Sequence, residues 1–196
     1  MKSVVTLNKV EFENHCALLA AKVIEGGFSP NLIVDIARGG SYVVENMRFP
    51  SPVARISVRR QRAGTPQKAM AAKAIAMLPV SVNNFLRAAE DWALSMISNL
   101  RFTSDDRHRS IEVDRIREQL TVCNATEKSM FVLIVDDALD SGKTVELVRE
   151  AVLKKYPSAS VKVAVIVATR AETAHMAEFQ SLTNVLVRFP WSSDVS

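Results

Sequence analysis

The sequence predicts an α/β fold centred on a parallel β-sheet, and three apolar runs carry this prediction. The runs cover residues 32–37, 131–135 and 161–168, and each is a nearly continuous series of Val, Ile, Leu and Ala. A strand that is apolar at consecutive positions is buried on both faces, as in parallel sheets with helices on both sides. Segments with helical spacing of apolar residues separate the runs. We therefore expect a doubly wound sheet in a single domain.

The first helix is expected between Asn8 and the Gly26-Gly27 pair. Asn8 is followed three residues later by Glu11, which is the spacing of a helix-capping pair, and an apolar stripe follows at helical spacing. Gly-Gly then ends the helix. The strand at 32–37 comes next and runs into a second helix at 41–47, after which residues 53–58 have the mixed character of a less buried strand.

Residues 64–122 are expected to form a helical insertion. Residues 67–77, 84–100 and 111–120 each have apolar residues at helical spacing, and Pro79 separates the first two. The middle helix carries an apolar stripe that includes Trp92, which would pack against the sheet or against a second subunit. The insertion is therefore the part of the chain on which we base the expectation of a homodimer.

The stretch from Phe131 to Thr144 joins a buried strand, acidic residues and a small-residue loop without a gap. Asp136 and Asp137 follow the apolar run, at the strand end where doubly wound sheets bind ligands. Residues 140–144, Asp-Ser-Gly-Lys-Thr, then lead into another helical pattern. Backbone amides in a Gly/Ser loop at a helix N-terminus form a cradle for an anion. This stretch is therefore expected to bind a phosphate beside two carboxylates.

Three other interpretations fit less well. A nucleotide-triphosphate loop needs glycine five positions before Gly142, where Asp137 stands. A receiver domain places its acid pair near its start, whereas only 59 residues follow Asp137 here. An ordinary strand-to-helix turn explains one capping acid, but not three acids together with a loop suited to phosphate.

Residues 131–144 resemble the signature of the type I phosphoribosyltransferases. The resemblance implies a Rossmann-like parallel sheet, with a small C-terminal hood, and the substrate 5-phosphoribosyl-1-pyrophosphate with Mg²⁺. It implies that Asp136 and Asp137 hold the ribose hydroxyls, directly or through the metal, and that Asp140 faces the incoming base. The residues that it assigns to the 5′-phosphate are Leu139, Asp140, Ser141, Gly142, Lys143 and Thr144.

The same resemblance assigns a pyrophosphate-binding loop after the first strand of the sheet. Family members often have Lys or Arg before Gly-Gly there, and this chain has Ala37, Arg38, Gly39 and Gly40. The Arg38 guanidinium offers several planar donors to phosphate oxygens. The family often holds this loop with a non-proline cis peptide. The basic residues 59–66 would be a flap that closes over the sugar, or only a solvated face.

The base is expected near Thr169, Arg170 and Trp191. In the 6-oxopurine branch of the family a lysine near the end of the third buried strand contacts the base carbonyl, whereas Thr169 and Arg170 stand there. Purine-type members often end with an aromatic segment over the base, and Trp191 would supply such a stacking face. They commonly carry an acid after the tryptophan, but Ser192 follows here.

Composition agrees with an intracellular enzyme. The chain has 196 residues, 48% of them hydrophobic, which suits one domain, and no apolar run approaches the ~20 residues of a membrane span. Its two cysteines, Cys16 and Cys123, have no metal-binding spacing and no secretory context, so we expect a reduced, cytoplasmic protein. The net charge of +4 suits phosphorylated substrates and does not by itself indicate nucleic acid.

Two functions follow from these observations. The first is a glycosyltransferase reaction in which a heterocyclic base, a purine by the closest resemblance, displaces pyrophosphate and becomes a nucleoside monophosphate. The second is a regulator that keeps the phosphoribosyl-pyrophosphate site as a sensor and binds RNA or a protein partner through the basic segment and the insertion. Asp140 favours the enzyme, because a sensor needs no acid beside a base, and the insertion favours the regulator.

Overall fold

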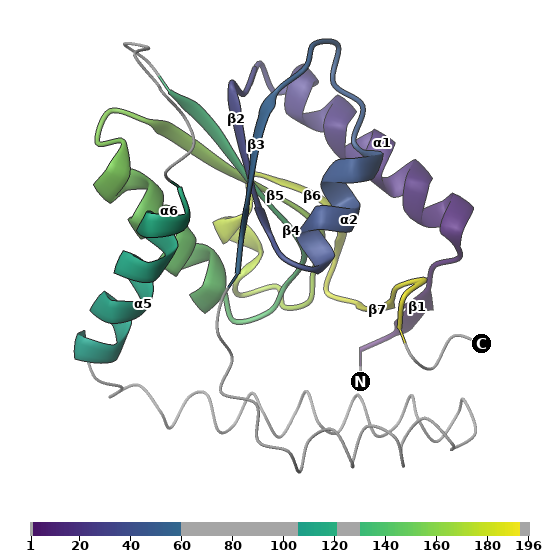
Figure 1. Ribbon diagram of the computed structural model, residues 1–196. Coiled ribbons are helices and arrows are strands. Elements are labelled where there is room, and N and C mark those ends of the chain that lie inside the picture. Colours follow the sequence, from purple (N-terminus) through teal and green to yellow (C-terminus); the bar gives the residue numbers. More distant parts are fainter. Residues whose placement is uncertain (1, 60–105, 121–129, 193–196) are drawn as a thin grey trace.

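The computed structural model describes residues 2–59, 106–120 and 130–192, and its centre is a five-stranded parallel sheet (Figure 1). The order of its strands is β3-β2-β4-β5-β6. The strands of this sheet are β2 (Leu32–Ile36), β3 (Ala54–Val58), β4 (Phe131–Leu139), β5 (Ser160–Ala168) and β6 (Phe179–Thr183). The helices are α1 (Lys9–Glu25), α2 (Gly39–Asn46), α5 (Asp106–Gln119) and α6 (Lys143–Lys155), with a short 3₁₀ turn η1 (Ala174–Met176).

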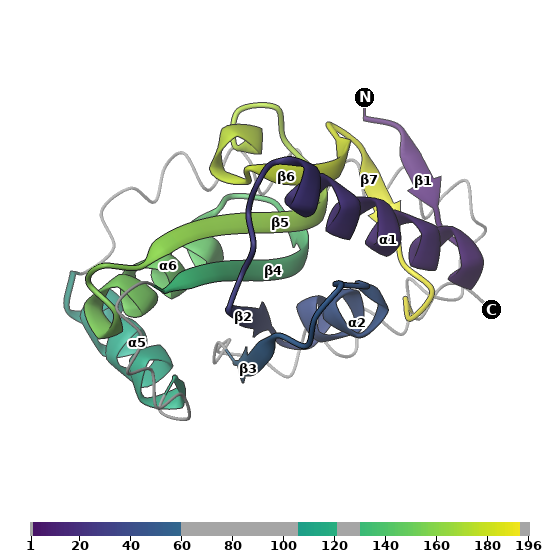
Figure 2. The ribbon, with the colours of Figure 1, turned by 90° about the horizontal axis from the view of Figure 1, so that it is seen from above.

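Helices cover both faces of the sheet, which confirms the α/β fold with a parallel sheet. Figure 2 shows α1 and α2 on one side and α5 and α6 on the other. Alternate residues of β2 and β4 face opposite layers: Leu32 and Val132 belong to the core under α5 and α6, whereas Ile33 and Leu133 belong to the core under α1 and α2. The apolar runs are continuous because both faces of these strands are buried.

Strand β4 is longer than the apolar run predicted. Asp136 and Asp137 do not end it, because its ladder with β5 continues to Leu139, paired with Ala168. The ladder with β2, however, stops at Val135. The acids therefore lie in a part of β4 that is paired on one side only. The end of the strand was predicted too early because the prediction used hydrophobicity alone. A strand can continue into polar residues wherever a neighbouring strand still offers backbone hydrogen-bond partners.

Helix α1 has the predicted cap. The Asn8 side chain accepts a hydrogen bond from the Glu11 amide at 3.0 Å, and the Glu11 carboxylate accepts one from the Asn8 amide at 2.8 Å. Both bonds satisfy amides that a helix N-terminus leaves without an internal partner. Helix α2 begins at Gly39, two residues earlier than expected from the apolar spacing.

Helix α5 lies in the predicted insertion and packs beside α6 in the same helical layer. Val113, Ile116 and Leu120 are buried in the core shared with β2, β4 and α6. The Arg109 guanidinium donates to Glu150 of α6 at 3.1 Å. The helices expected at 67–77 and 84–100, together with Trp92, lie outside the described residues.

The hood is a second, two-stranded parallel sheet that joins the two ends of the described chain. Strand β1 (Val4–Thr6) pairs with β7 (Leu186–Arg188), so the N-terminal strand, which the pattern did not predict, completes the predicted C-terminal hood. Strand β6 was not predicted either. Within the described ranges, none of the helices combines the length and the apolar content that crossing a bilayer requires.

Candidate active site

The strand order reverses between β2 and β4, and both predicted phosphate loops lie at this point. The chain passes from β2 through α2 to β3 on one side, whereas β4 leads through α6 to β5 on the other. Where connections diverge in this way, a crevice opens at the carboxyl ends of the two strands. Residues 37–40 follow β2, and residues 136–144 span the end of β4 and the start of α6. The topology therefore brings together two loops that are about a hundred residues apart in the sequence.

Two glycines allow the loops to approach each other closely. A Cβ atom on Gly39 would collide with the carboxylate of Asp137. A Cβ atom on Gly40 would collide with the carbonyl oxygen of Val135 and lie 3.2 Å from the Asp136 Cα. A side chain at position 40 would push α2 away from the backbone of β4, and one at position 39 would displace the Asp137 carboxylate. The two glycines therefore place the start of α2 directly against the acid pair.

The loop at 37–40 has an exposed cation and the cis peptide that the resemblance implies. The peptide bond between Ala37 and Arg38 is cis, and the Arg38 side chain is exposed. The Ala37 amide donates to the carbonyl of Val58 at 2.9 Å, which ties the loop to β3. Arg38 is the N-cap residue of α2, so its guanidinium and the positive end of the helix dipole lie in the same region.

The loop at 139–144 has the geometry of an anion cradle. Gly142 is the N-cap residue of α6, has a φ of 74°, and as a glycine has no side chain with which to cap the helix. Ser141 and Lys143 are exposed, whereas Gly142 is buried beneath Met176, whose sulfur would collide with a Cβ atom at this position. The amides of the first turn of α6 are therefore arranged as in helix N-termini that bind phosphate.

Asp140 contacts two of the residues that were expected to bind the base. The Arg170 Nε donates to its Oδ1 at 2.6 Å, and the Thr169 hydroxyl donates to the same oxygen at 3.1 Å. A second Arg170 nitrogen lies 3.4 Å from Oδ2, and the Thr173 hydroxyl donates to the Asp140 carbonyl at 2.7 Å. The Asp140 side chain is still 50% exposed, whereas that of Arg170 is 13% exposed. Both carboxylate oxygens thus accept hydrogen bonds, and the group remains open to solvent.

Trp191 lies in an aromatic cluster between the hood and two helices. Its ring stacks on Phe189 with a centroid distance of 4.8 Å and an interplanar angle of 4°. Tyr42 of α2 lies 4.6 Å away at 30°, and Phe12 of α1 meets the ring edge-on at 4.9 Å. Tyr42 is itself 41% exposed. The structure therefore connects Trp191 to α2 through Tyr42, and its role as a stacking face stays a prediction.

The acid pair suits Mg²⁺ as a shared ligand set. Asp136 accepts a hydrogen bond from the Asp137 amide at 2.9 Å, and both side chains are half-buried. In the described part of the chain no three His, Cys, Asp or Glu residues are grouped so that they could hold a metal by themselves. Mg²⁺ typically uses one or two carboxylates and completes its octahedron with water and substrate phosphates. The two carboxylates fit that pattern.

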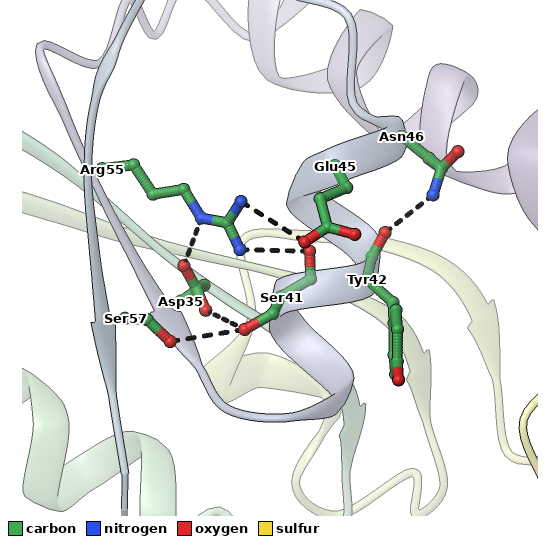
Figure 3. A network of polar contacts seen from close by, with 7 residues as sticks. All are labelled: Asp35, Ser41, Tyr42, Glu45, Asn46, Arg55 and Ser57. Atoms are coloured by element: carbon green, nitrogen blue, oxygen red, sulfur yellow. Dashed lines mark hydrogen bonds and ion pairs between the residues drawn. The ribbon is translucent and has the colours of Figure 1, made fainter.

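A buried polar network beside the first loop was missed in the sequence. Figure 3 shows Asp35, Ser41, Arg55 and Ser57 joined at the junction of β2, β3 and α2. Asp35 is fully buried in an apolar strand, and that position was the available signal, because a buried carboxylate requires a partner. The partner, Arg55, could not be identified without the pairing of β2 with β3.

The fold is that of a doubly wound α/β protein, and two turns with the geometry expected for phosphate binding lie at its switch point. A family model described as "Phosphoribosyl transferase domain" matches residues 111–193. No curated protein sequence matches the chain.

Solved structures of phosphoribosyltransferases have the same fold. A purine phosphoribosyltransferase from Pyrococcus horikoshii has a TM-score of 0.54 and 19% identity, and the match covers 97% of this chain and 94% of the other. A xanthine-guanine-hypoxanthine phosphoribosyltransferase from Helicobacter pylori has a TM-score of 0.52 and 14% identity over 98% and 95%. A hypothetical protein from Neisseria gonorrhoeae with bound ppGpp has a TM-score of 0.56 and 16% identity over 97% and 90%.

Proposed function

We propose that this protein is a phosphoribosyltransferase that uses 5-phosphoribosyl-1-pyrophosphate and Mg²⁺ to convert a heterocyclic base, by fold similarity a purine, into its nucleoside monophosphate. The observation that carries this proposal is the contact between Gly39 and Asp137. It places a loop suited to pyrophosphate against the acids suited to ribose. The second phosphate loop, at 139–144, lies at the end of β4, directly after these acids. A substrate with phosphate groups at both ends of one sugar fits that arrangement.

Each part of the substrate has a proposed partner. The loop at 139–144 would bind the 5′-phosphate through backbone amides at the start of α6. Asp136 and Asp137 would accept hydrogen bonds from the ribose hydroxyls, directly or through the metal. Arg38 and the amides of Gly39 and Gly40 would bind the pyrophosphate. These assignments agree with the exposure of Arg38, Ser141 and Lys143.

The reaction forms a bond between a base nitrogen and the anomeric carbon and breaks the bond from that carbon to pyrophosphate. Positive charge develops on the ribose while negative charge gathers on the departing group. The carboxylates beside the sugar stabilise the first charge, and Arg38 stabilises the second. When bound, Mg²⁺ would neutralise further charge on the pyrophosphate oxygens.

Asp140 is the residue that we propose to accept a proton from the entering base. Its exposure of 50% leaves it accessible, and Arg170 and Thr169 hold its carboxylate in one orientation. In this arrangement Thr169 and Arg170 would act on the base through Asp140 as well as by direct contact. Trp191 would provide the stacking face for the base after the Tyr42 ring moves off the indole ring.

The test is pyrophosphate release from 5-phosphoribosyl-1-pyrophosphate with a panel of purines, pyrimidines and other heterocycles. We expect at least one base to be turned over in the presence of Mg²⁺, and activity to be lost in excess chelator. Asp136→Asn and Asp137→Asn should each lower turnover, because the charge beside the sugar is lost while the shape is kept. Full activity in both variants would contradict the proposed site.

The second candidate is a nucleotide sensor with the same fold. It is favoured by the engagement of both Asp140 oxygens with Arg170 and by the ppGpp bound to the Neisseria protein. In this case the protein would bind phosphoribosyl pyrophosphate or ppGpp in calorimetry and turn over no base. The protein would then regulate an RNA or protein partner that binds the insertion.

A further inference from the structure

An ion pair between a buried carboxylate and a partly exposed arginine lies behind the first phosphate loop. Asp35 of β2 is fully buried, and the Arg55 Nε of β3 donates to its Oδ2 at 2.6 Å. The Ser41 hydroxyl of α2 donates to the other oxygen, Oδ1, at 2.5 Å. Both carboxylate oxygens therefore have charge-assisted or short hydrogen bonds, which offsets part of the cost of taking the charge out of water.

Arg55 and Ser41 extend this pair into a network that joins three elements. Another Arg55 nitrogen donates to the Ser41 carbonyl at 3.2 Å, and a third lies 3.7 Å from a carboxylate oxygen of Glu45. The Ser41 and Ser57 hydroxyls are 3.3 Å apart. Figure 3 shows that β2, β3 and the first two turns of α2 all contribute to these contacts.

The network binds both ends of the loop at 37–40. Asp35 stands two residues before Ala37, and Ser41 directly follows Gly40. Together with the bond from the Ala37 amide to Val58, these contacts fix the entry to the loop and its exit. A loop held at both ends has fewer orientations for its backbone amides and for Arg38.

A contribution to stability alone is a weak reason for such a network. Replacing a buried ion pair with well-packed apolar residues is often neutral or stabilising, whereas removing one partner is costly. The position is also surrounded by an apolar sheet, in which Val, Ile and Leu fill the other buried sites of β2. A polar network in which every group is hydrogen-bonded can instead fix the orientation of the functional groups beside it.

We propose that Asp35, Arg55 and Ser41 are positioning residues that hold the loop at 37–40 in the conformation that binds the pyrophosphate group. This inference rests on the proposed function. None of the three residues has to touch the substrate. Ser41 transmits the orientation to the first turn of α2, and Arg55 locks Asp35 to β3. Displacement of binding groups by about 1 Å is sufficient to reduce binding or rate by up to ~10²-fold.

The test compares two probes that use different loops, inorganic pyrophosphate with Mg²⁺ and ribose 5-phosphate, both measured by calorimetry. We expect Ser41→Ala and Asp35→Asn to weaken pyrophosphate binding roughly tenfold or more, and to leave ribose 5-phosphate binding within about twofold. The matched control is Asn46→Ala. Asn46 lies on the same helix and donates to the Tyr42 carbonyl at 2.9 Å, but it is not part of the contacts around Asp35. It should leave both affinities unchanged.

The outcomes separate this inference from the proposed function. Equal weakening of both probes, or unchanged pyrophosphate binding in folded Ser41→Ala, would overturn the positioning role. Wild-type protein that binds ribose 5-phosphate but no pyrophosphate would also overturn it, while the 5′-phosphate loop would stand. Wild-type protein that binds neither probe would overturn the proposed function and this inference together. If Asp35→Asn does not fold, Ser41→Ala decides, because it leaves the ion pair in place.

Discussion

At the scale of single residues, Gly142 has the most constrained position in the second phosphate loop. Its φ of 74° lies in the left-handed region, and Met176 fills the space beside its Cα. A larger residue there meets two separate obstacles, one in its own backbone conformation and one in its neighbour. Glycine is therefore strongly favoured at this position, chiefly by the backbone conformation, since the end of the Met176 side chain can shift.

Gly142→Ala is expected to destabilise the protein by about 1–2 kcal/mol from the left-handed conformation, with an additional cost from the clash with Met176. Urea unfolding measures the loss, and calorimetry with phosphoribosyl pyrophosphate measures the effect on binding. The control is the same substitution in a Met176→Ala background, which removes the clash and leaves the conformational cost. Equal losses in both backgrounds would show that Met176 does not limit the site.

Asp140 is the residue on which the enzyme and the sensor differ most. Asp140→Asn keeps the size of the side chain but removes the charge that Arg170 contacts at 2.6 Å. If Asp140 accepts the proton of the base, turnover should fall by roughly 10²–10⁴-fold, whereas phosphoribosyl pyrophosphate should still bind. Steady-state kinetics and calorimetry on the same variant measure the two effects.

The control for Asp140 is Glu172→Gln, which removes an exposed carboxylate from the same end of the sheet. It should leave turnover unchanged. A parallel fall in binding and turnover in Asp140→Asn would assign the residue to the structure of the loop. No change in binding, with no base turned over by the wild type, would favour the sensor.

At the scale of the elements, one carboxylate completes the start of the β5–β6 pairing. The ladder begins with Ala164 and Phe179, and one residue earlier the amide of Val163 donates to the Glu178 carboxylate at 2.7 Å. Val163 is fully buried, so this amide has no access to water. The side chain of Glu178 takes the place that a backbone carbonyl would have if β6 began earlier.

Glu178→Ala is therefore expected to lower the free energy of unfolding by about 1–3 kcal/mol, the typical cost of a buried donor without a partner. The control is Arg149→Ala, which removes the 3.1 Å ion pair with Glu178 and keeps the bond to Val163. Since that ion pair is partly exposed, its loss should cost at most about 1 kcal/mol. Chemical denaturation of both variants measures the difference. Similar losses of unfolding free energy in the two variants would show that the hydrogen bond from the Val163 amide to Glu178 does not stabilise the protein.

At the scale of the whole molecule, α1 closes one face of the sheet and buries the thiol of Cys16. This side chain is fully buried in the core under α1 and α2. Burial raises its pKa from 9.0 to about 12, with a smaller contribution from the charge of Glu13. The thiol is therefore protonated at neutral pH and inaccessible while α1 is docked.

Alkylation of Cys16 should report the opening of the whole α1 layer. In a Cys123→Ser background, labelling by iodoacetamide at pH 8 should follow the global unfolding rate and accelerate with urea. Since the pKa is higher in the folded state, the unfolded state loses its proton first, and stability should fall as pH rises from 9.0 towards about 12. Cys16→Ala removes that dependence and is the control. Rapid labelling without denaturant would show that α1 opens locally.

The expected homodimer also belongs to this scale. It rests on the apolar stripe that contains Trp92, which lies outside the described residues, so it stays a prediction. The same holds for the basic flap beyond Arg59. Helix α5 shows, however, that the far end of the predicted insertion supplies core residues to the sheet.

The sequence by itself determined the central strands, the helices around them that the structure describes, and the positions of the two loops, but not β1 or β6. Continuous apolar runs predicted β2, β4 and β5, because strands buried on both faces need such residues, and the Asn8–Glu11 spacing predicted the cap of α1. The loops at 37–40 and 139–144 could be located as candidate phosphate sites because glycine and a helix start are adjacent in the chain at both places. Such local patterns are readable because the interactions that they specify span only a few residues.

Only the tertiary structure decided how these parts meet. The pairing of Asp35 with Arg55, the contact of Gly39 with Asp137 and the ion pair of Asp140 with Arg170 all join separate strands or loops. The extension of β4 through its acids and the pairing of β1 with β7 likewise depend on a neighbouring strand. Periodicity states which residues face a core, but not which strand lies beside them or in which register. Those relations follow from the packing of all the layers at once, and the geometry of the candidate site is built from them.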